Sequence, residues 1–172
     1  MWCIDKGKVC WPVWLPRDHY LIQEADRRSR LVIPHDDRSP VKVLLLANRI
    51  AQELWGKQLS FDQAASHRSA VVIGGSRLPF NAFCMQPGAA GVNMFRNLGS
   101  WRRNINYVYP PSPMTGRLLT FLPQTRAKSM VVFPSPEGSK WWSYAVQKHS
   151  AGVVKSVSAH GFKIVAFDFS DS

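Results

Sequence analysis

Arginine and aromatic residues are interleaved in this chain in a pattern that could contact a nucleic acid. Guanidinium groups bind phosphates and aromatic rings stack on bases, a combination typical of proteins that recognise single strands and RNA loops. The alternative is a solvated basic face whose aromatic neighbours, Phe95 and Tyr107 among them, belong to the core. The predicted nucleic-acid-binding residues are Arg27, Arg28, Arg30, Arg96, Trp101, Arg102, Arg103, Arg117 and Lys140.

The overall charge supports a polyanionic partner. The 172 residues include 22 Lys and Arg but 11 Asp and Glu, which gives a formal net charge of +11 at pH 7. A small domain with this charge attracts polyanions through its long-range field. The basic residues are dispersed and no basic amphipathic helix stands out, so a membrane surface is not the expected partner. We predict nucleic acid, RNA rather than DNA, together with protein neighbours in a larger assembly.

Cysteine and histidine residues give no metal-binding pattern. Cys3, Cys10 and Cys84 cannot all pair, and no C-x-x-C or Cys/His cluster has zinc spacing. The five histidines are scattered, so we expect surface or capping roles for them. The sequence therefore predicts no metal site. It also predicts an intracellular, reducing compartment, such as a mitochondrion or the nucleus.

Hydrophobic periodicity predicts helices alternating with strands after a proline- and tryptophan-rich arm over 1–17. Ser39 and Pro40 suit the start of a helix that Gly56 would end. Residues 66–104 contain several Gly and Pro residues and predict a mobile or partner-ordered loop. The expected helices are 18–30, 40–55, 112–122 and 139–148, and the expected strands are 59–64, 106–109, 129–133, 153–157 and 162–167. A short turn around His160-Gly161 is expected to join the last two strands.

This alternation predicts an α/β fold with a partly parallel sheet. The length favours one domain with a short appendage. We place the appendage at 1–38, an N-terminal arm and short helix, and the α/β domain at 39–172.

The stretch WLPRDHYLIQEADRRSR at 14–30 resembles the closing segment of the ribonuclease H domain of retroelement polyproteins. In that family the aspartate matching Asp26 binds a metal. The resemblance does not imply nuclease activity, because one carboxylate cannot hold two magnesium ions and the other carboxylates would lie upstream of Met1.

Three motifs within 41–148 occur in the order WGKQLSFDQAAS, NYVYPPSPMTGRLLTFL and SMVVFPSPEGSKWWSYAV. This order resembles the Dam-like adenine-methyltransferase domain of phages and of DIRS-type retrotransposons. The resemblance implies a small three-layer Rossmann-like methyltransferase sheet, here truncated or degenerate, with an extended N-terminal arm.

The resemblance also implies where methyl transfer would occur. Such enzymes bind S-adenosylmethionine at the carboxyl ends of parallel strands, and Asp62 matches an acidic cofactor-binding position. A D/N-P-P-aromatic turn in the family holds the target amine and stacks on an extruded base. Here the turn reads Tyr109-Pro110-Pro111-Ser112, so a weak acceptor replaces the amide or carboxylate and serine cannot stack. We expect these catalytic positions to be inactive and no cofactor to be bound.

Three functions follow as alternatives. The first, which we favour, is a catalytically inactive RNA-binding or structural component of a ribonucleoprotein, such as an organellar ribosome. The second is an active S-adenosylmethionine-dependent N6-adenine DNA methyltransferase. The third is a retroelement remnant without a function of its own.

Overall fold

The chain divides into two units, Met1–Pro34 and His35–Ser172. A computed structural model describes residues 4–5, 8–9, 23, 38–134 and 150–171. In the first unit, β1 (Ile4–Asp5) pairs antiparallel with β2 (Lys8–Val9). The helices predicted over 18–30 and 139–148 lie outside the described residues, apart from Gln23.

A five-stranded mixed sheet with the strand order β10-β11-β9-β8-β3 forms the centre of the second unit. β3, β8 and β9 are parallel neighbours, while β11 pairs antiparallel with both β9 and β10. Strands were predicted in all five places, and the mixed α/β class is confirmed. The bounds are β3 Phe61–Asp62, β8 Ile105–Val108, β9 Lys128–Pro134, β10 Val153–Ala159 and β11 Phe162–Asp168.

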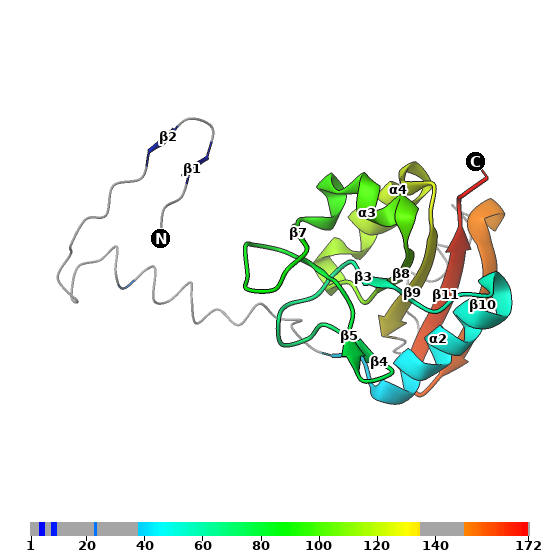
Figure 1. The fold of residues 1–172 in the computed structure, drawn as a ribbon. Helices are drawn as coiled ribbons and strands as arrows, with labels where there is room; N and C mark the ends of the chain where they lie inside the picture. The colour runs from blue at the N-terminus through cyan, green and yellow to red at the C-terminus, as the bar shows by residue number, and fades with distance from the viewer. Residues whose placement is uncertain (1–3, 6–7, 10–22, 24–37, 135–149, 172) are drawn as a thin grey trace. The chain divides into compact units, whose positions relative to one another are not determined.

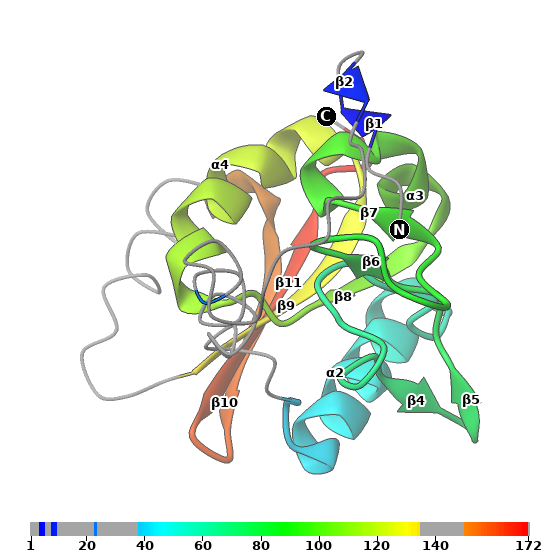
Figure 2. The same ribbon diagram turned by 90° about the vertical axis from the view of Figure 1, so that its left-hand side faces the viewer.

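Helices cover both faces of this sheet (Figures 1 and 2). Successive side chains of a strand point to opposite faces, and the core divides accordingly. On one face, Ile105, Tyr107 and Met130 pack with helix α2 (Val41–Trp55). We call this the α2 face. Val108 and Val131 pack with α4 (Thr115–Thr125) and the short helix α3 (Leu98–Arg103), which define the α3/α4 face.

Helix α2 matches the helix predicted from the sequence. Apolar residues at helical spacing, including Val43, Ala47 and Ile50, are buried against the sheet. Gly56 follows with φ of 64°, a left-handed conformation that glycine adopts without steric cost and that ends the helix. The helix predicted from 112 is also confirmed, since the 3-10 helix η2 (Ser112–Met114) leads directly into α4.

The last two strands form the predicted hairpin. β10 and β11 are joined by His160 and Gly161, which have φ of 53° and 76°. Positive φ at both central residues is what a tight two-residue hairpin turn requires.

The segment 66–104, predicted as a mobile or partner-ordered loop, contains short regular elements. The segment forms two short strand pairs, a 3-10 helix η1 (Met94–Arg96) and α3, and it buries Phe80 and Trp101 almost completely. Its glycines and prolines shape turns between short elements, which the sequence alone does not distinguish from a flexible loop. The paired strands are β4 Val72–Ile73 with β5 Ser76–Arg77, and β6 Asn81–Ala82 with β7 Gly91–Val92.

Candidate functional site

The carboxyl ends of β3 and β8 bring together two motifs that are far apart in the sequence. Asp62 is the last residue of β3 and is the register partner of Tyr107 in β8. The Tyr109-Pro110-Pro111 turn begins just after β8 ends at Val108. Ligands of open α/β sheets bind at this edge of parallel strands. The structure therefore places the acidic residue and the proline turn at the edge where a ligand site would form.

The carboxylate of Asp62 is engaged within the protein. Its side chain is 2% exposed, and its two oxygens accept the backbone N–H groups of Ala64 at 3.3 Å and Val71 at 3.2 Å. Burial raises the pKa of Asp62 to about 7, against the opposing effect of these two hydrogen bonds. Asp62 therefore holds the segment that follows β3, and a ligand could reach it only if that segment moved.

The proline turn joins β8 to the following helix. Pro110 and Pro111 are buried, and the Pro111 carbonyl accepts the N–H of Met114 at 2.9 Å. The Tyr109 ring packs edge-to-face on Phe162, with centroids 6.1 Å apart, at the border of the α2-face core. Ser112 begins η2. This arrangement fits a structural turn, with the tyrosine directed to the core.

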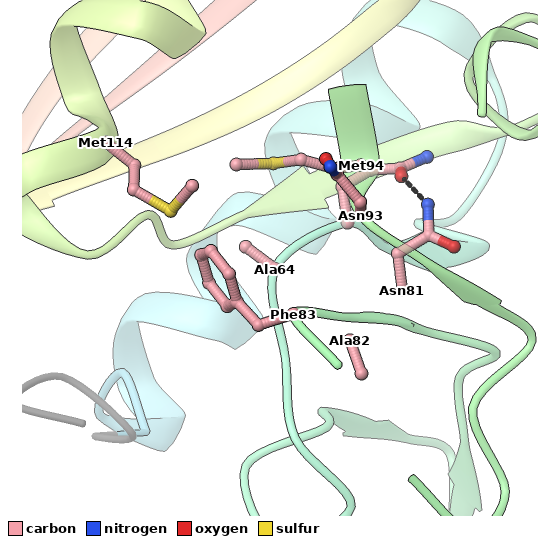
Figure 3. Close-up of a pocket in the computed structure, with 8 residues that line it drawn as sticks. Ala64, Asn81, Ala82, Phe83, Asn93, Met94 and Met114 are labelled. Atoms are coloured by element: carbon pink, nitrogen blue, oxygen red, sulfur yellow. Dashed lines mark hydrogen bonds between the residues drawn. The ribbon is translucent and has the colours of Figure 1, made fainter. Parts of the chain in front are cut away.

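A small hollow opens beside this turn on the α3/α4 face (Figure 3). It encloses about 190 Å³, including open solvent at its mouth. Met94, Met114 and Phe83 supply apolar surface, while Tyr109 does not line it. Its polar lining comes from Gln63, Asn81 and Asn93.

The amides beside the hollow belong to a buried hydrogen-bond network. Gln63 Nε2 donates to Asn106 Oδ1 at 2.7 Å and to Ser100 Oγ at 3.2 Å. Asn81 Nδ2 donates to Gln63 Oε1 at 2.6 Å, and Asn97 Nδ2 donates to Asn81 Oδ1 at 3.4 Å. These contacts connect β3, β6, β8 and α3. This network was not predicted from the sequence, although the asparagines at 93, 97, 104 and 106, within a stretch free of acidic residues, were a usable signal.

Asn106 is the centre of this network. It is fully buried, and its Nδ2 group lies 2.9 to 3.1 Å from the carbonyl oxygens of Trp101, Asn104 and Lys128. These carbonyls belong to α3, to the residue that ends it and to the start of β9. The side chain therefore fixes α3 against the sheet.

Five arginines are exposed on α3, α4 and their ends, and we call them the arginine surface. The Arg117 guanidinium lies over the Phe95 ring, 4.1 Å from its centroid, a cation–π contact. Residues 63–134 contain eight Lys and Arg residues but no Asp or Glu, so no acidic residue of this stretch neutralises the surface. Its members are Arg96, Arg102, Arg103, Arg117 and Arg126.

Trp101, which the sequence predicts to contact nucleic acid, lies in the core. Its side chain is 0% exposed, its Nε1 donates to the Met94 carbonyl at 2.8 Å, and its ring packs on Phe121. Tyr107 is 1% exposed and bonds through its hydroxyl to Ser39. Both rings fill the core, where apolar area and a bonded polar group are satisfied together. Four other predicted contact residues, Arg27, Arg28, Arg30 and Lys140, lie outside the described residues.

Within 4–5, 8–9, 23, 38–134 and 150–171, no group of three or more His, Cys, Asp or Glu side chains could hold a metal ion. The helices described there include none that is long and apolar enough to cross a bilayer. Cys84 is exposed with a free thiol.

Comparison with known proteins adds no relative. The chain matches no protein-family model, and neither the curated proteins nor the solved structures contain a significant match.

Proposed function

We propose that this protein binds nucleic acid, RNA rather than DNA, through the arginine surface, and that it does not catalyse methyl transfer. The observation that carries the proposal is the charge of residues 63–134, where eight basic residues occur without an acidic one. Because residues 63–134 contain no carboxylate, no ion pair within this stretch competes with phosphate for these arginines. Phosphate contacts of this kind supply most of the non-specific affinity of nucleic-acid-binding proteins.

The state of the carboxyl edge supports the absence of catalysis. The position where an amine acceptor is needed is occupied by Tyr109, whose ring packs on Phe162. Asp62, the acidic cofactor position, is already bonded to Ala64 and Val71. Loss of a single preorganised polar group at such a site typically costs about 3–4 kcal/mol of transition-state stabilisation.

The proposal is tested by purifying the full chain and identifying what accompanies it. We expect an absorbance ratio typical of nucleic acid, removable by ribonuclease, and binding that weakens steeply as salt is raised. Preparations free of nucleic acid, with no binding to RNA or DNA at low salt, would refute it. Sequencing of the retained RNA would also test whether the protein belongs to a ribonucleoprotein such as an organellar ribosome.

An active methyltransferase related to the Dam-like family is the second candidate. One observation favours it: Asp62 and the Tyr109-Pro110-Pro111 turn meet at the same sheet edge. This candidate predicts saturable S-adenosylmethionine binding by calorimetry that Asp62→Ala abolishes. We expect no heat of binding at high cofactor concentration.

A further inference from the structure

We infer that the arginine surface binds the sugar-phosphate backbone of double-stranded nucleic acid and not a single strand. This inference rests on the proposed nucleic-acid-binding function and specifies its partner. It reverses the expectation drawn from the sequence, where interleaved aromatic residues favoured single strands and RNA loops. The structure separates the two residue types, because the arginines face outward while the aromatic rings face the core.

The aromatic rings of this region are unavailable for base stacking. Trp101, Tyr107 and Phe121 are at most 9% exposed. Phe95 is half-buried, and its ring contacts the edge-to-face partner Phe121 and the guanidinium of Arg117. Binding of single strands usually depends on rings on which successive bases stack. Within the described part of this layer, the groups left for a ligand are the guanidinium groups.

The arginines lie at both ends of the helical layer that α3 and α4 form on the sheet. Arg117 lies in the first turn of α4 and Arg126 just after its end, which separates them by about 14 Å along the helix axis. Arg103 lies at the same end as Arg126. Arg103 stands two residues before Ile105 and Arg126 stands two residues before Lys128. Ile105 and Lys128 are register partners in β8 and β9. The separation is comparable with the width of the major groove of B-DNA, about 12 Å, whereas an RNA duplex presents its phosphates across a wide minor groove. Two phosphate rows across a groove would meet the two ends of the layer.

This surface is held in place before any ligand arrives. Asn106 bonds to three carbonyls at the end of α3 and the start of β9. Asn93 and Asn97 cap η1 and α3 through the backbone N–H groups of Phe95 and Ser100. A rigid surface suits a partner that is itself preformed, whereas a flexible single strand loses conformational entropy when it is fixed in one geometry.

Three described acidic residues of the second unit, Glu53, Asp62 and Asp168, lie on the α2 face. Tyr107 contributes to the α2 face and is the register partner of Asp62. Glu53 lies on α2, and Asp168 accepts a hydrogen bond from Trp55 of α2. These three acidic residues therefore lie on the opposite face of the sheet from the arginine surface.

One exposed ring could still support a single strand. Phe83 is 40% exposed and lines the hollow with Met114 (Figure 3). A single-strand mode would therefore depend on Phe83, while a duplex mode would not. This difference makes Phe83→Leu a useful variant.

The test measures binding of the full chain by fluorescence anisotropy over a series of salt concentrations. The probes are an RNA duplex and a DNA duplex of about 16 base pairs and one strand of each alone. Two variants remove charge from the two ends, Arg96→Gln with Arg117→Gln and Arg103→Gln with Arg126→Gln. The matched control, Lys42→Gln with Arg49→Gln, removes the same charge from exposed positions of α2. Thermal melting by circular dichroism checks that all variants fold.

We expect a duplex to bind at least about ten-fold more tightly than its single strand. Each arginine pair should lower the slope of log K against log salt by about 1.8, since each lost phosphate contact removes about 0.9. The control and Phe83→Leu should leave duplex binding unchanged. Tighter binding of single strands, or loss of binding in Phe83→Leu, would overturn the duplex inference while the proposed function stands. No binding of any probe would refute the proposed function itself, and the RNA and DNA arms decide which duplex is preferred.

Discussion

The two faces of the central sheet are built differently. On the α2 face an amphipathic helix packs apolar side chains on the strands, and the acidic side chains Glu53, Asp62 and Asp168 lie on that side. On the α3/α4 face a network of buried amides joins the strands to short helices, and arginines cover the exterior. Both faces therefore pack an apolar core, but the exterior of the α3/α4 face also presents a fixed cationic surface.

The largest expected effect is a loss of folding stability when a buried asparagine is replaced. One asparagine from each face is compared. Asn106→Ala should lower the free energy of unfolding by about 4–5 kcal/mol, because it leaves several buried partners, including the Lys128 carbonyl, without their hydrogen bonds. Asn48→Ala should lower it by about 1–2 kcal/mol, because Asn48 accepts a single backbone N–H, that of Leu59. Urea unfolding of both variants measures the difference. Equal losses would show that the amide network does not hold the α3/α4 face together.

The next effect is the pH dependence of stability that Asp62 causes. Burial raises the pKa of Asp62 from its ordinary value of 3.8 to about 7 in the folded protein. The folded state therefore keeps a proton that the unfolded state releases, so stability is full below pH 4 and falls as pH rises from about 4 to 7. The loss should reach about 4 kcal/mol above pH 7.

Unfolding in urea at several pH values checks this effect of Asp62. Asp62→Asn cannot ionise and should flatten the slope between pH 4 and 7. A wild-type stability that rises over this range, or an unchanged slope in the variant, would contradict the expectation.

A smaller effect compares two glycines of the α3/α4 face. A Cβ at Gly91 would collide with Asn81 Oδ1 and come within 2.8 Å of Asn97 Nδ2, so Gly91→Ala should cost about 2–3 kcal/mol. At Gly99, within α3, the nearest atoms are the flexible tip of Arg103 at 3.4 Å. Gly99→Ala should therefore be neutral or stabilise by up to about 1 kcal/mol. Melting temperatures of the two variants would sharpen the comparison, and a benign Gly91→Ala would show that the network can rearrange.

The smallest effect concerns the ion pair on the α2 face. Lys155 Nζ lies 3.2 Å from Glu53 Oε2, and both side chains are about half exposed. Glu53→Gln should change the free energy of unfolding by no more than about 0.5 kcal/mol, since exposed pairs contribute little. Thermal unfolding at low and high salt checks this, and a loss above 1 kcal/mol would mean that the acidic residues of the α2 face stabilise the fold directly.

Local patterns in the sequence predicted most of the regular elements. Val43, Ala47 and Ile50 recur at helical spacing and Gly56 ends the helix, so α2 could be foreseen to within a residue. The five strands and the turn at His160-Gly161 also followed from apolar runs and turn residues. The irregular composition of 66–104 concealed a packed segment, because very short strands such as β6 and β7 carry no periodicity to detect.

The sequence by itself determined the charge, the α/β class and the presence of a strand before each candidate motif. Only the tertiary structure decided which side chains face outward. In the folded protein Trp101 and Tyr107 are buried in the core, while Arg102 and Arg103 are exposed. The carboxylate of Asp62 accepts a backbone hydrogen bond from the segment that follows it. The physical reason is that the charge and the hydrophobic periodicity of a segment are local properties of the sequence, whereas burial depends on which distant elements pack together. Gln63 and Asn106 became hydrogen-bond partners because β3 and β8 lie side by side, 43 residues apart in sequence.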